Sequence, residues 1–279
     1  MYTPHGAGWH LDRVRFDAFL ARQAAQCGVE VLLARRLSEA KALTDGWHLR
    51  LSDGTECSAR FVVDATGRRA SFARRAGARL LLFDRLACLA RFCTLGNEPE
   101  SSTVIEAFSE GWWYTALAGE HRIIACMTDM DVARRLALHH EDRWRSLLSQ
   151  TQWIQRSIGS GTLCGAAIIC TANSARREPV CGSAWLAVGD AASVFDPLSS
   201  QGIVKSLRSG IFAAYAIADC LVKSDRRGLT RYARFIQQEF ASYRRAHVHY
   251  YSTERRWPER CFWRRRQQGS LSSPSGISV

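Results

Sequence analysis

The sequence lacks any stretch that is long and apolar enough to cross a membrane. No run approaches the ~20 apolar residues that a membrane span requires, and the first residues, MYTPHGAGWHLDR, do not contain the apolar centre of a signal peptide. With 279 residues, of which 47% are hydrophobic, the chain has room for one large domain or two moderate ones with a core. These features predict a cytoplasmic protein with no membrane contact.

The sequence also lacks a metal-binding or disulfide pattern. Its ten cysteines are scattered, with no Cys-x-x-Cys pair, and most have apolar neighbours. Buried, reduced thiols are therefore the expected state. His139-His140 and His247-x-His249 have no partners at zinc-site spacing. We predict no metal site.

Negative charge is scarce relative to positive charge. The chain has 38 Lys and Arg against 26 Asp and Glu, a net charge of +12, and arginines crowd the segment RRWPERCFWRRR at 255–266. Basic residues interleaved with Trp257, Phe262 and Trp263 are capable of binding nucleic acid through phosphates and stacking. No nucleic-acid motif surrounds them. We therefore expect a solvated helix end, whose field would suit an acidic protein partner or an anionic cofactor.

The first third of the chain predicts one helix followed by strands. Apolar residues share one helical face over 16–27, and the segment VEVLL at 29–33 predicts a strand. Over 47–67 the sequence alternates, turns at Asp53-Gly54, alternates again and ends in a continuous apolar strand. This order predicts an α/β sheet that carries a β-ribbon.

The middle of the chain predicts a second, antiparallel sheet. Four strands are expected between 85 and 128, in LACLARFCTL, STVIEAF, GWWYTAL and RIIACMT, and a charged amphipathic helix at 131–150. After 185 the α/β pattern returns, with helices expected over 203–223 and 229–251. An α/β domain that is interrupted and later resumed predicts two domains whose cleft holds a ligand.

The segment WLAVGDAASVFDPLSSQGIVKSL, residues 185–207, places an aspartate directly after a buried strand. Gly189 and Asp190 follow the strand, Asp196-Pro197 imposes a turn, and an apolar helix begins after Ser200. Unpaired N–H groups and the positive end of a helix dipole would converge there, which suits an anion or an electron-rich ring. The alternative is a tight strand-to-helix connection with a capping aspartate.

Three segments resemble one family, the FAD-dependent aromatic hydroxylases and flavin halogenases. WHLDRVRFDAFLARQAAQCGVEV (9–31) resembles their arginine-containing helix entry, FVVDATGRRA (61–70) their strand-end ATG segment, and VGDAASVFDPLSSQGI (188–203) their GD segment. The resemblance implies FAD as cofactor. It also implies an α/β fold, with a Rossmann-like three-layer FAD-binding domain, an inserted antiparallel β-sheet domain for the substrate, and C-terminal helices.

The resemblance implies roles for particular residues. Asp190 would hold a ribityl hydroxyl, and backbone groups of Ser200 to Ile203 would stabilise negative charge on the reduced flavin. Arg13 would approach the FAD phosphates or ribityl chain, and Asp64 to Gly67 would line the adenosine side. A surface salt bridge for Arg13 and a turn cap for Asp64 remain alternatives. The cofactor-binding residues expected from the resemblance are Arg13, Asp64, Ala65, Thr66, Gly67, Gly189, Asp190, Pro197, Ser200, Gln201, Gly202 and Ile203.

The branch of the family is read from the stretch Trp112-Trp113-Tyr114-Thr115-Ala116-Leu117. Halogenases carry Trp-x-Trp-x-Ile-Pro at the comparable place, and three of these positions are replaced here. The stretch, with the GD segment and the C-terminal region, looks most like the flavoproteins that mature tryptophylquinone enzymes. That resemblance implies hydroxylation of a tryptophan in a quinoprotein precursor, with Trp112, Trp113 and Tyr114 lining the substrate face or, equally, serving as core aromatics.

The family's Gly-x-Gly-x-x-Gly turn has no counterpart in this sequence. We therefore expect a truncated member, with a partial FAD-binding domain at 1–84, a substrate domain at 85–184, a completing segment with C-terminal helices at 185–266 and a disordered tail at 267–279. A flavin halogenase is one alternative function. A non-catalytic basic remnant that binds a protein or nucleic acid is another. No catalytic base and no electron donor, whether a flavin reductase or NAD(P)H, is assigned.

Overall fold

The structure is a computed structural model that describes residues 10–95, 101–268 and 275–276. The chain forms two compact units, of which unit 1 contains residues 1–34 and 88–170 and unit 2 contains residues 35–87 and 171–279. The chain passes from one unit to the other at 34/35, 87/88 and 170/171, whereas the sequence analysis expected boundaries at 84/85 and 184/185. The role of each domain stays a prediction. Each unit is described by itself.

Unit 2 is the α/β part of the chain. Its strands form three sheets, in the orders β1-β2-β3, β12-β13-β4 and β14-β11-β5-β15. The strands are β1 Leu37–Leu43, β2 Gly46–Leu51, β3 Glu56–Ala59, β4 Val62–Asp64, β5 Arg79–Leu82, β11 Ala175–Glu178, β12 Cys181–Gly182, β13 Trp185–Ala187, β14 Ser193–Val194 and β15 Ser275–Gly276. The helices are α2 Ser71–Arg75, α6 Gly202–Lys223, α7 Arg227–Thr253 and α8 Cys261–Gln268, with the 3-10 turns η1 Gly67–Arg69, η2 Gly189–Ala191 and η3 Pro197–Ser199.

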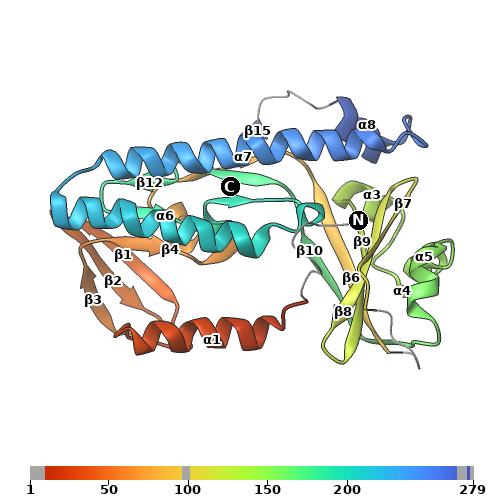
Figure 1. Cartoon of the computed structure of the whole chain (residues 1–279), viewed down its shortest axis with the longest axis horizontal. Coiled ribbons are helices and arrows are strands. Elements are labelled where there is room, and N and C mark those ends of the chain that lie inside the picture. Colours follow the sequence, from red (N-terminus) through yellow and green to blue (C-terminus); the bar gives the residue numbers. More distant parts are fainter. Residues whose placement is uncertain (1–9, 96–100, 269–274, 277–279) are drawn as a thin grey trace. The chain divides into compact units, whose positions relative to one another are not determined.

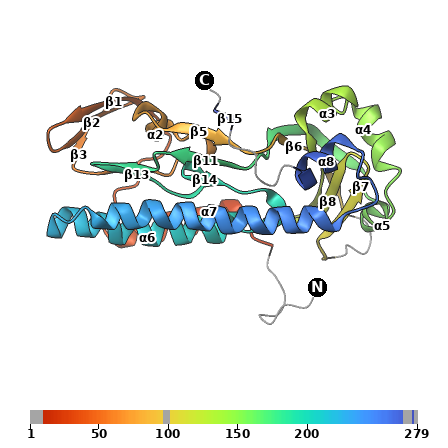
Figure 2. The same cartoon turned by 90° about the horizontal axis from the view of Figure 1, so that it is seen from above.

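Unit 2 has three layers. Figure 2 shows α6 and α7 side by side on one face of the sheet that contains β13, and the β1-β2-β3 ribbon on the other. The core between the layers includes Leu186, Ala187 and Ile236, with Trp47 and Phe72 in edge-to-face contact at 4.7 Å between ring centroids. The turn of the ribbon lies at Asp53–Gly54, as predicted, with Gly54 at φ +88°.

Unit 1 is an antiparallel sheet with helices. The strand order is β10-β6-β9-β8-β7, which contains the four predicted strands and a fifth, β10, that was not predicted. The strands are β6 Leu86–Thr94, β7 Val104–Phe108, β8 Gly111–Ala118, β9 His121–Asp129 and β10 Leu163–Thr171, and the helices are α1 Arg13–Gln26, α3 Met130–Arg135, α4 Glu141–Leu148 and α5 Trp153–Ile158 (Figure 1). Its core is centred on Trp113 and Trp144, whose rings meet edge to face at 5.1 Å between centroids.

Two predictions about the elements were wrong, and a third falls mostly on residues that the structure does not describe. The segment 29–33 forms no strand and its apolar side chains are exposed. The helix expected over 131–150 is two helices, α3 and α4, because the chain turns between them with Ala137 at φ +53°. The tail predicted at 267–279 lies largely outside the described residues, while 267 and 268 end α8 and 275–276 form β15.

Helix α6 presents apolar side chains on two opposite sides. Ala213 and Ala216 are buried in the core of unit 2, whereas Ile211 and Tyr215 are 57% and 68% exposed. The exposed stripe continues at helical spacing through Val204, Leu207 and Val222. The outer edge of β4, where Val63 is also exposed, has no strand beside it in the described part of the chain. An apolar helix face of this kind is normally covered.

No helix in the described residues is both long and apolar enough to span a membrane.

A cross-element cap joins β7 to α5 in unit 1, and it yields a stability prediction. The Glu106 carboxylate accepts the backbone N–H groups of Gln152, Trp153 and Ile154 at 2.7, 2.9 and 3.0 Å. Glu106→Ala leaves these helix-end donors without their partner, so we expect a loss of about 1–3 kcal/mol in the free energy of unfolding, measured by urea denaturation. Glu120→Ala, in an exposed turn of the same sheet, should change it by less than about 0.5 kcal/mol. Equal losses in the two variants would contradict the capping role.

Candidate functional site

The parallel pairing of β4 with β13 brings two of the predicted segments together. Ala187 is aligned with Asp64 in the register, and the Val188 N–H donates to the Asp64 carbonyl at 2.9 Å. Because both strands end at the same edge of the sheet, the turn at Asp64–Gly67 lies beside the turn at Gly189–Asp190. The carboxyl ends of parallel strands are where α/β folds bind ligands.

Asp64 holds the first of these turns. Its buried carboxylate accepts from Thr66 N and Oγ1 at 2.9 and 2.6 Å, and from Phe72 N and Ala73 N at 2.9 and 2.7 Å. The last two bonds satisfy donors at the start of α2. The side chain therefore does the capping that the sequence left as an alternative, and a cofactor would meet the exposed Ala65 and Thr66.

Gly189 and Asp190 form the second turn. Gly189 adopts φ +55°, its N–H donates to Ser209 Oγ at 2.8 Å, and a Cβ there would lie 3.0 Å from Ser206 Oγ. The backbone therefore passes close to α6, as only glycine readily allows. The Asp190 side chain is 37% exposed and accepts from Lys205 Nζ at 2.8 Å.

Lys205 is a buried cation that the sequence analysis did not single out. It is 2% exposed, donates to Asp190 and to the carbonyl of Ser193, and lies 4.9 Å above the Phe195 ring. Burial lowers the pKa of Lys205 below its usual range, and Asp190 opposes that shift. A lone lysine between apolar positions of α6 was the signal available in the sequence.

The N-terminus of α6 is open toward the same region. Gln201 occupies the N-cap without a side-chain cap, Ser200 adopts φ +51°, and Lys205 N is the first helical donor, bonding to Gln201 O at 2.8 Å. The N–H groups of Gly202 and Ile203 have no acceptor among the residues that the structure describes. An anion or a polarised ring would therefore find donors and the positive end of a 22-residue helix dipole.

Asp196 anchors the loop that leads into α6. Its carboxylate accepts from Leu198 N and Tyr251 OH, both at 2.8 Å, and lies 3.3 Å from His247 Nε2. Tyr243 OH accepts the Asp196 N–H at 2.9 Å. Tyr243, His247 and Tyr251 are spaced four residues apart on α7, so one face of that helix holds the loop. The spacing of four residues in the sequence is the signal that places these three side chains on one face of α7.

The remaining predicted residues lie in unit 1. Arg13 is exposed and pairs with Asp17 at 3.0 Å, which is the salt-bridge alternative. Trp113 is fully buried against Trp144 and Phe108, as a core aromatic would be. Its neighbours along β8, Trp112 and the half-buried Tyr114, face the other side of the sheet, because side chains alternate along a strand. Burial raises the pKa of Tyr114.

The described residues contain no group of three or more His, Cys, Asp or Glu side chains placed to hold a metal ion.

These turns lie at the carboxyl ends of parallel strands in a three-layer α/β unit, and comparison with known proteins gives the family of the chain. The sequence model of the tryptophan halogenase family matches residues 3–276, so the chain belongs to this family. Its members are FAD-dependent oxidoreductases, and a solved halogenase of the same fold is in complex with FAD.

Individual relatives come from more than one branch. The chain is 29% identical over 274 residues to a putative FAD-dependent oxidoreductase, LodB, of Marinomonas mediterranea, covering 95% of this chain and 73% of LodB. The myxobacterial chondrochloren halogenase CndH superposes with a TM-score of 0.82 at 22% identity, over 94% of this chain and 64% of CndH. The peptidyl tryptophan dihydroxylase QhpG, essential for tryptophylquinone cofactor biogenesis, superposes with a TM-score of 0.74 at 26% identity, over 92% of this chain and 59% of QhpG.

The chain therefore spans about three-quarters of LodB and less than two-thirds of these solved structures. The family includes enzymes that act on peptide or carrier-protein substrates.

The Asp196 anchor supports a prediction about stability. Tyr251→Phe removes the hydroxyl donor to a buried carboxylate, so we expect a loss of about 1.5–3 kcal/mol in the free energy of unfolding, measured by chemical denaturation. Tyr250→Phe removes a hydroxyl from the exposed neighbour and should cost less than about 0.5 kcal/mol. If Tyr251→Phe costs no more than Tyr250→Phe, the anchor is not what holds the loop.

Proposed function

We propose that this chain carries the ribityl- and pyrimidine-facing part of a FAD site in a monooxygenase that hydroxylates a tryptophan side chain of a partner protein. The observation that carries the proposal is the convergence of Asp190, the Asp64–Gly67 turn and the open N-terminus of α6 at one sheet edge. The Asp190 carboxylate would accept from the ribityl hydroxyls of FAD, and the exposed backbone of the Asp64–Gly67 turn would line its adenosine side. The N–H donors at the start of α6 would face the edge of the flavin ring.

The residues present fit one end of the cofactor. Asp190 has a partly exposed carboxylate to accept from a ribityl hydroxyl, and Ser200 to Ile203 offer backbone groups at the helix N-terminus. Pro197 shapes the approach to them within η3. The sequence contains no Gly-x-Gly-x-x-Gly turn for the diphosphate. Arg13 and the Asp64–Gly67 turn are assigned to the phosphate and adenosine side as part of the same proposal.

Lys205 is assigned a positioning role. Its ammonium group fixes one carboxylate oxygen of Asp190 and is itself tied to the Ser193 carbonyl, so the second oxygen keeps a constant direction. A carboxylate held in this way binds a hydroxyl without first losing side-chain freedom. When bound and reduced, FAD supplies the activation of O₂, while the protein contributes binding, orientation and exclusion of water.

The choice of a tryptophan hydroxylase over a halogenase rests on the stretch 112–117. Three of the halogenase signature positions are replaced, and QhpG, a peptidyl tryptophan dihydroxylase by name, is among the similar structures. We assign Trp112 and Tyr114 to the substrate side, since they lie on the sheet face opposite to Trp113, which packs against Trp144 of α4. A net charge of +12 would favour docking of an acidic quinoprotein precursor. Halogen transfer is the second candidate, favoured by the family's name.

The cofactor part of the proposal has a direct test. A polypeptide of these 279 residues should bind FAD weakly, because the sequence has no glycine-rich diphosphate cradle, and its fusion to a strand–Gly-x-Gly-x-x-Gly–helix unit should be yellow. In that fusion, Asp190→Ala should weaken FAD at least about tenfold in flavin titration, since a charge-assisted hydrogen bond is lost. Asp45→Ala, on an exposed turn, is the matched control. An unchanged dissociation constant in Asp190→Ala would refute the assignment of this turn.

The reaction is tested on the same fusion. Given reduced flavin, O₂, bromide and an acidic quinoprotein precursor, it should add oxygen to a tryptophan of that partner. This transfer requires the partner to dock so that the substrate ring comes within about 3–3.5 Å of the reacting centre. Mass spectrometry of the partner should show oxygen mass gains without a bromine isotope pattern. Bromination of free tryptophan under these conditions would instead support the halogenase alternative.

A further inference from the structure

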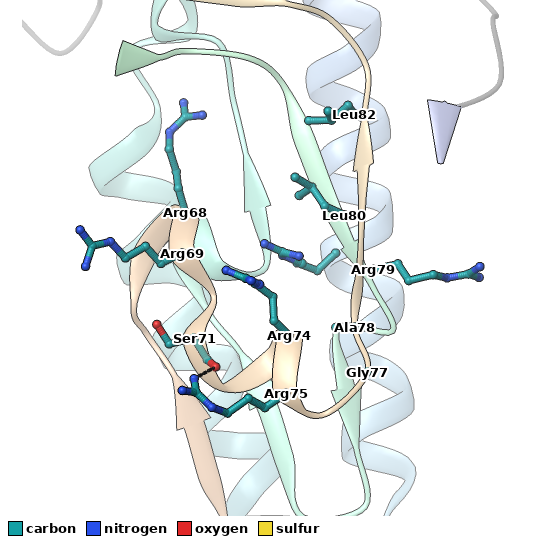
Figure 3. A pocket seen from close by; sticks show the side chains of 11 residues that line it. Arg68, Arg69, Ser71, Arg74, Arg75, Gly77, Ala78, Arg79, Leu80 and Leu82 are labelled. Atoms are coloured by element: carbon teal, nitrogen blue, oxygen red, sulfur yellow. Dashed lines mark hydrogen bonds between the residues drawn. The ribbon is translucent and has the colours of Figure 1, made fainter. Parts of the chain in front are cut away.

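Unit 2 contains a cavity in which arginines gather. A cavity of about 680 Å³ is lined by η1, α2 and the strands β5 and β11. We call it the arginine pocket; six of its lining residues are Arg68, Arg69, Arg74, Arg75, Arg79 and Arg177 (Figure 3). Ala78, Leu80 and Leu82 supply an apolar wall. This volume is in the range of small-ligand sites.

Arg177 is the buried member of the group. It is only 7% exposed, yet its guanidinium has no hydrogen bond or ion pair with any residue in the described part of the chain. Burial lowers the pKa of Arg177, and the like charge of Arg74 lowers it further. The negative charge of Asp64 opposes these shifts without forming a hydrogen bond or ion pair with Arg177. Because Arg177 lines the cavity, an anion that enters the cavity would meet its guanidinium group.

Neighbouring arginines are placed to share such an anion. Figure 3 shows Arg74 rising from α2 into the space between η1 and β5, whereas Arg69 and Arg79 point outward in opposite directions. Arg68 is anchored by bonds from Nη1 to the Asn173 backbone and side-chain oxygens at 3.3 and 3.2 Å, which leaves its other nitrogens available. Arg75 donates to the Ser71 carbonyl at 2.7 Å.

No acidic side chain among the described lining residues neutralises this charge. Asp64 is the acid that acts on Arg177 electrostatically, and its carboxylate already accepts four hydrogen bonds from Thr66, Phe72 and Ala73. The residues that line the pocket therefore carry a net positive charge.

We propose that the arginine pocket is a binding site for a phosphate-bearing small molecule, with Arg74 and Arg177 as the central ligands and Arg68 at its side. Guanidinium groups bind phosphate oxygens through paired N–H donors, and two of them suit a phosphate or diphosphate better than a single carboxylate. The wall of Leu80 and Leu82 would accept an apolar or ring portion of the same molecule. The proposal does not depend on the proposed function, because pyrophosphate binding and its loss in the variants are measured on the chain without flavin.

The binding test uses inorganic pyrophosphate and isothermal titration calorimetry on the 279-residue chain. We expect Arg74→Ser to weaken pyrophosphate at least about tenfold, since a charged hydrogen-bond donor is lost. Arg85→Ser removes the same charge from an exposed site outside the pocket and should change the dissociation constant less than twofold. Equal weakening in both variants would mean non-specific attraction by net charge and would overturn the proposal.

Arg177 gives a second, independent readout. In Arg177→Met the unpaired buried charge is gone, so the thermal midpoint without ligand should stay the same or rise, while pyrophosphate affinity falls at least about tenfold. A purely structural arginine would behave in the opposite way. A lower thermal midpoint of Arg177→Met, together with unchanged pyrophosphate binding in Arg74→Ser, would overturn the proposed phosphate site.

Two sources of phosphate are separated by competition in the fusion that carries the Gly-x-Gly-x-x-Gly unit. Displacement of pyrophosphate by FAD assigns the pocket to the flavin's own diphosphate, and undiminished pyrophosphate binding beside saturating FAD assigns it to a second phosphate ligand such as a nucleotide. Both results support the phosphate site. A hepta-glutamate peptide that binds the pocket when pyrophosphate does not would overturn it in favour of an acidic protein segment.

Discussion

The parallel pairing of β4 with β13 is the contact on which the candidate site depends. The two strands lie more than a hundred residues apart in sequence, and each contributes only three residues to the pair. Their common direction places the turn after Asp64 against the turn after Val188, with one interstrand hydrogen bond spanning the junction. The rest of the site is built outward from that edge, because α2 follows the first turn through η1, and α6 follows the second through β14 and η3. An antiparallel pairing would have separated them by the length of the strands.

Two largely buried cations in unit 2 differ in how the free-energy cost of burying a positive charge is offset. Lys205 is compensated inside the chain by Asp190, a backbone carbonyl and an aromatic ring, so it acts as part of the scaffold of the proposed flavin site. Arg177 has a like-charged neighbour and no ion-pair partner in the described residues. The first arrangement is stable without any ligand. The second would gain further stability from a bound anion, as the proposed phosphate site requires.

The exposed stripe on α6 and the open edge of β4 suggest what would complete the proposed FAD site. Ile211 and Tyr215 lie on the side of α6 opposite to the buried Ala213, and the outer edge of β4 is open. A strand placed against β4 and a helix placed along the stripe would cover both features and would bring a glycine-rich turn to the same sheet edge. This geometry is the physical reason why the fusion experiment adds a strand, a turn and a helix in that order.

The sequence by itself determined most of the elements and the identity of the residues at the two turns. Period-two alternation predicted the ribbon and four strands of the antiparallel sheet, and the Gly-Asp and Asp-Pro pairs marked the loop before α6, because these signals depend on local backbone preferences. Local signals did not separate α3 from α4 or exclude a strand at 29–33. Periodicity shows which residues of α6 share a face, but it does not tell which face meets the core, so the exposure of the stripe through Ile211 was known only from the structure. The ion pair of Lys205, the anchor of Asp196 on α7 and the isolation of Arg177 were decided only by the tertiary structure, because each joins or separates charges from elements distant in sequence.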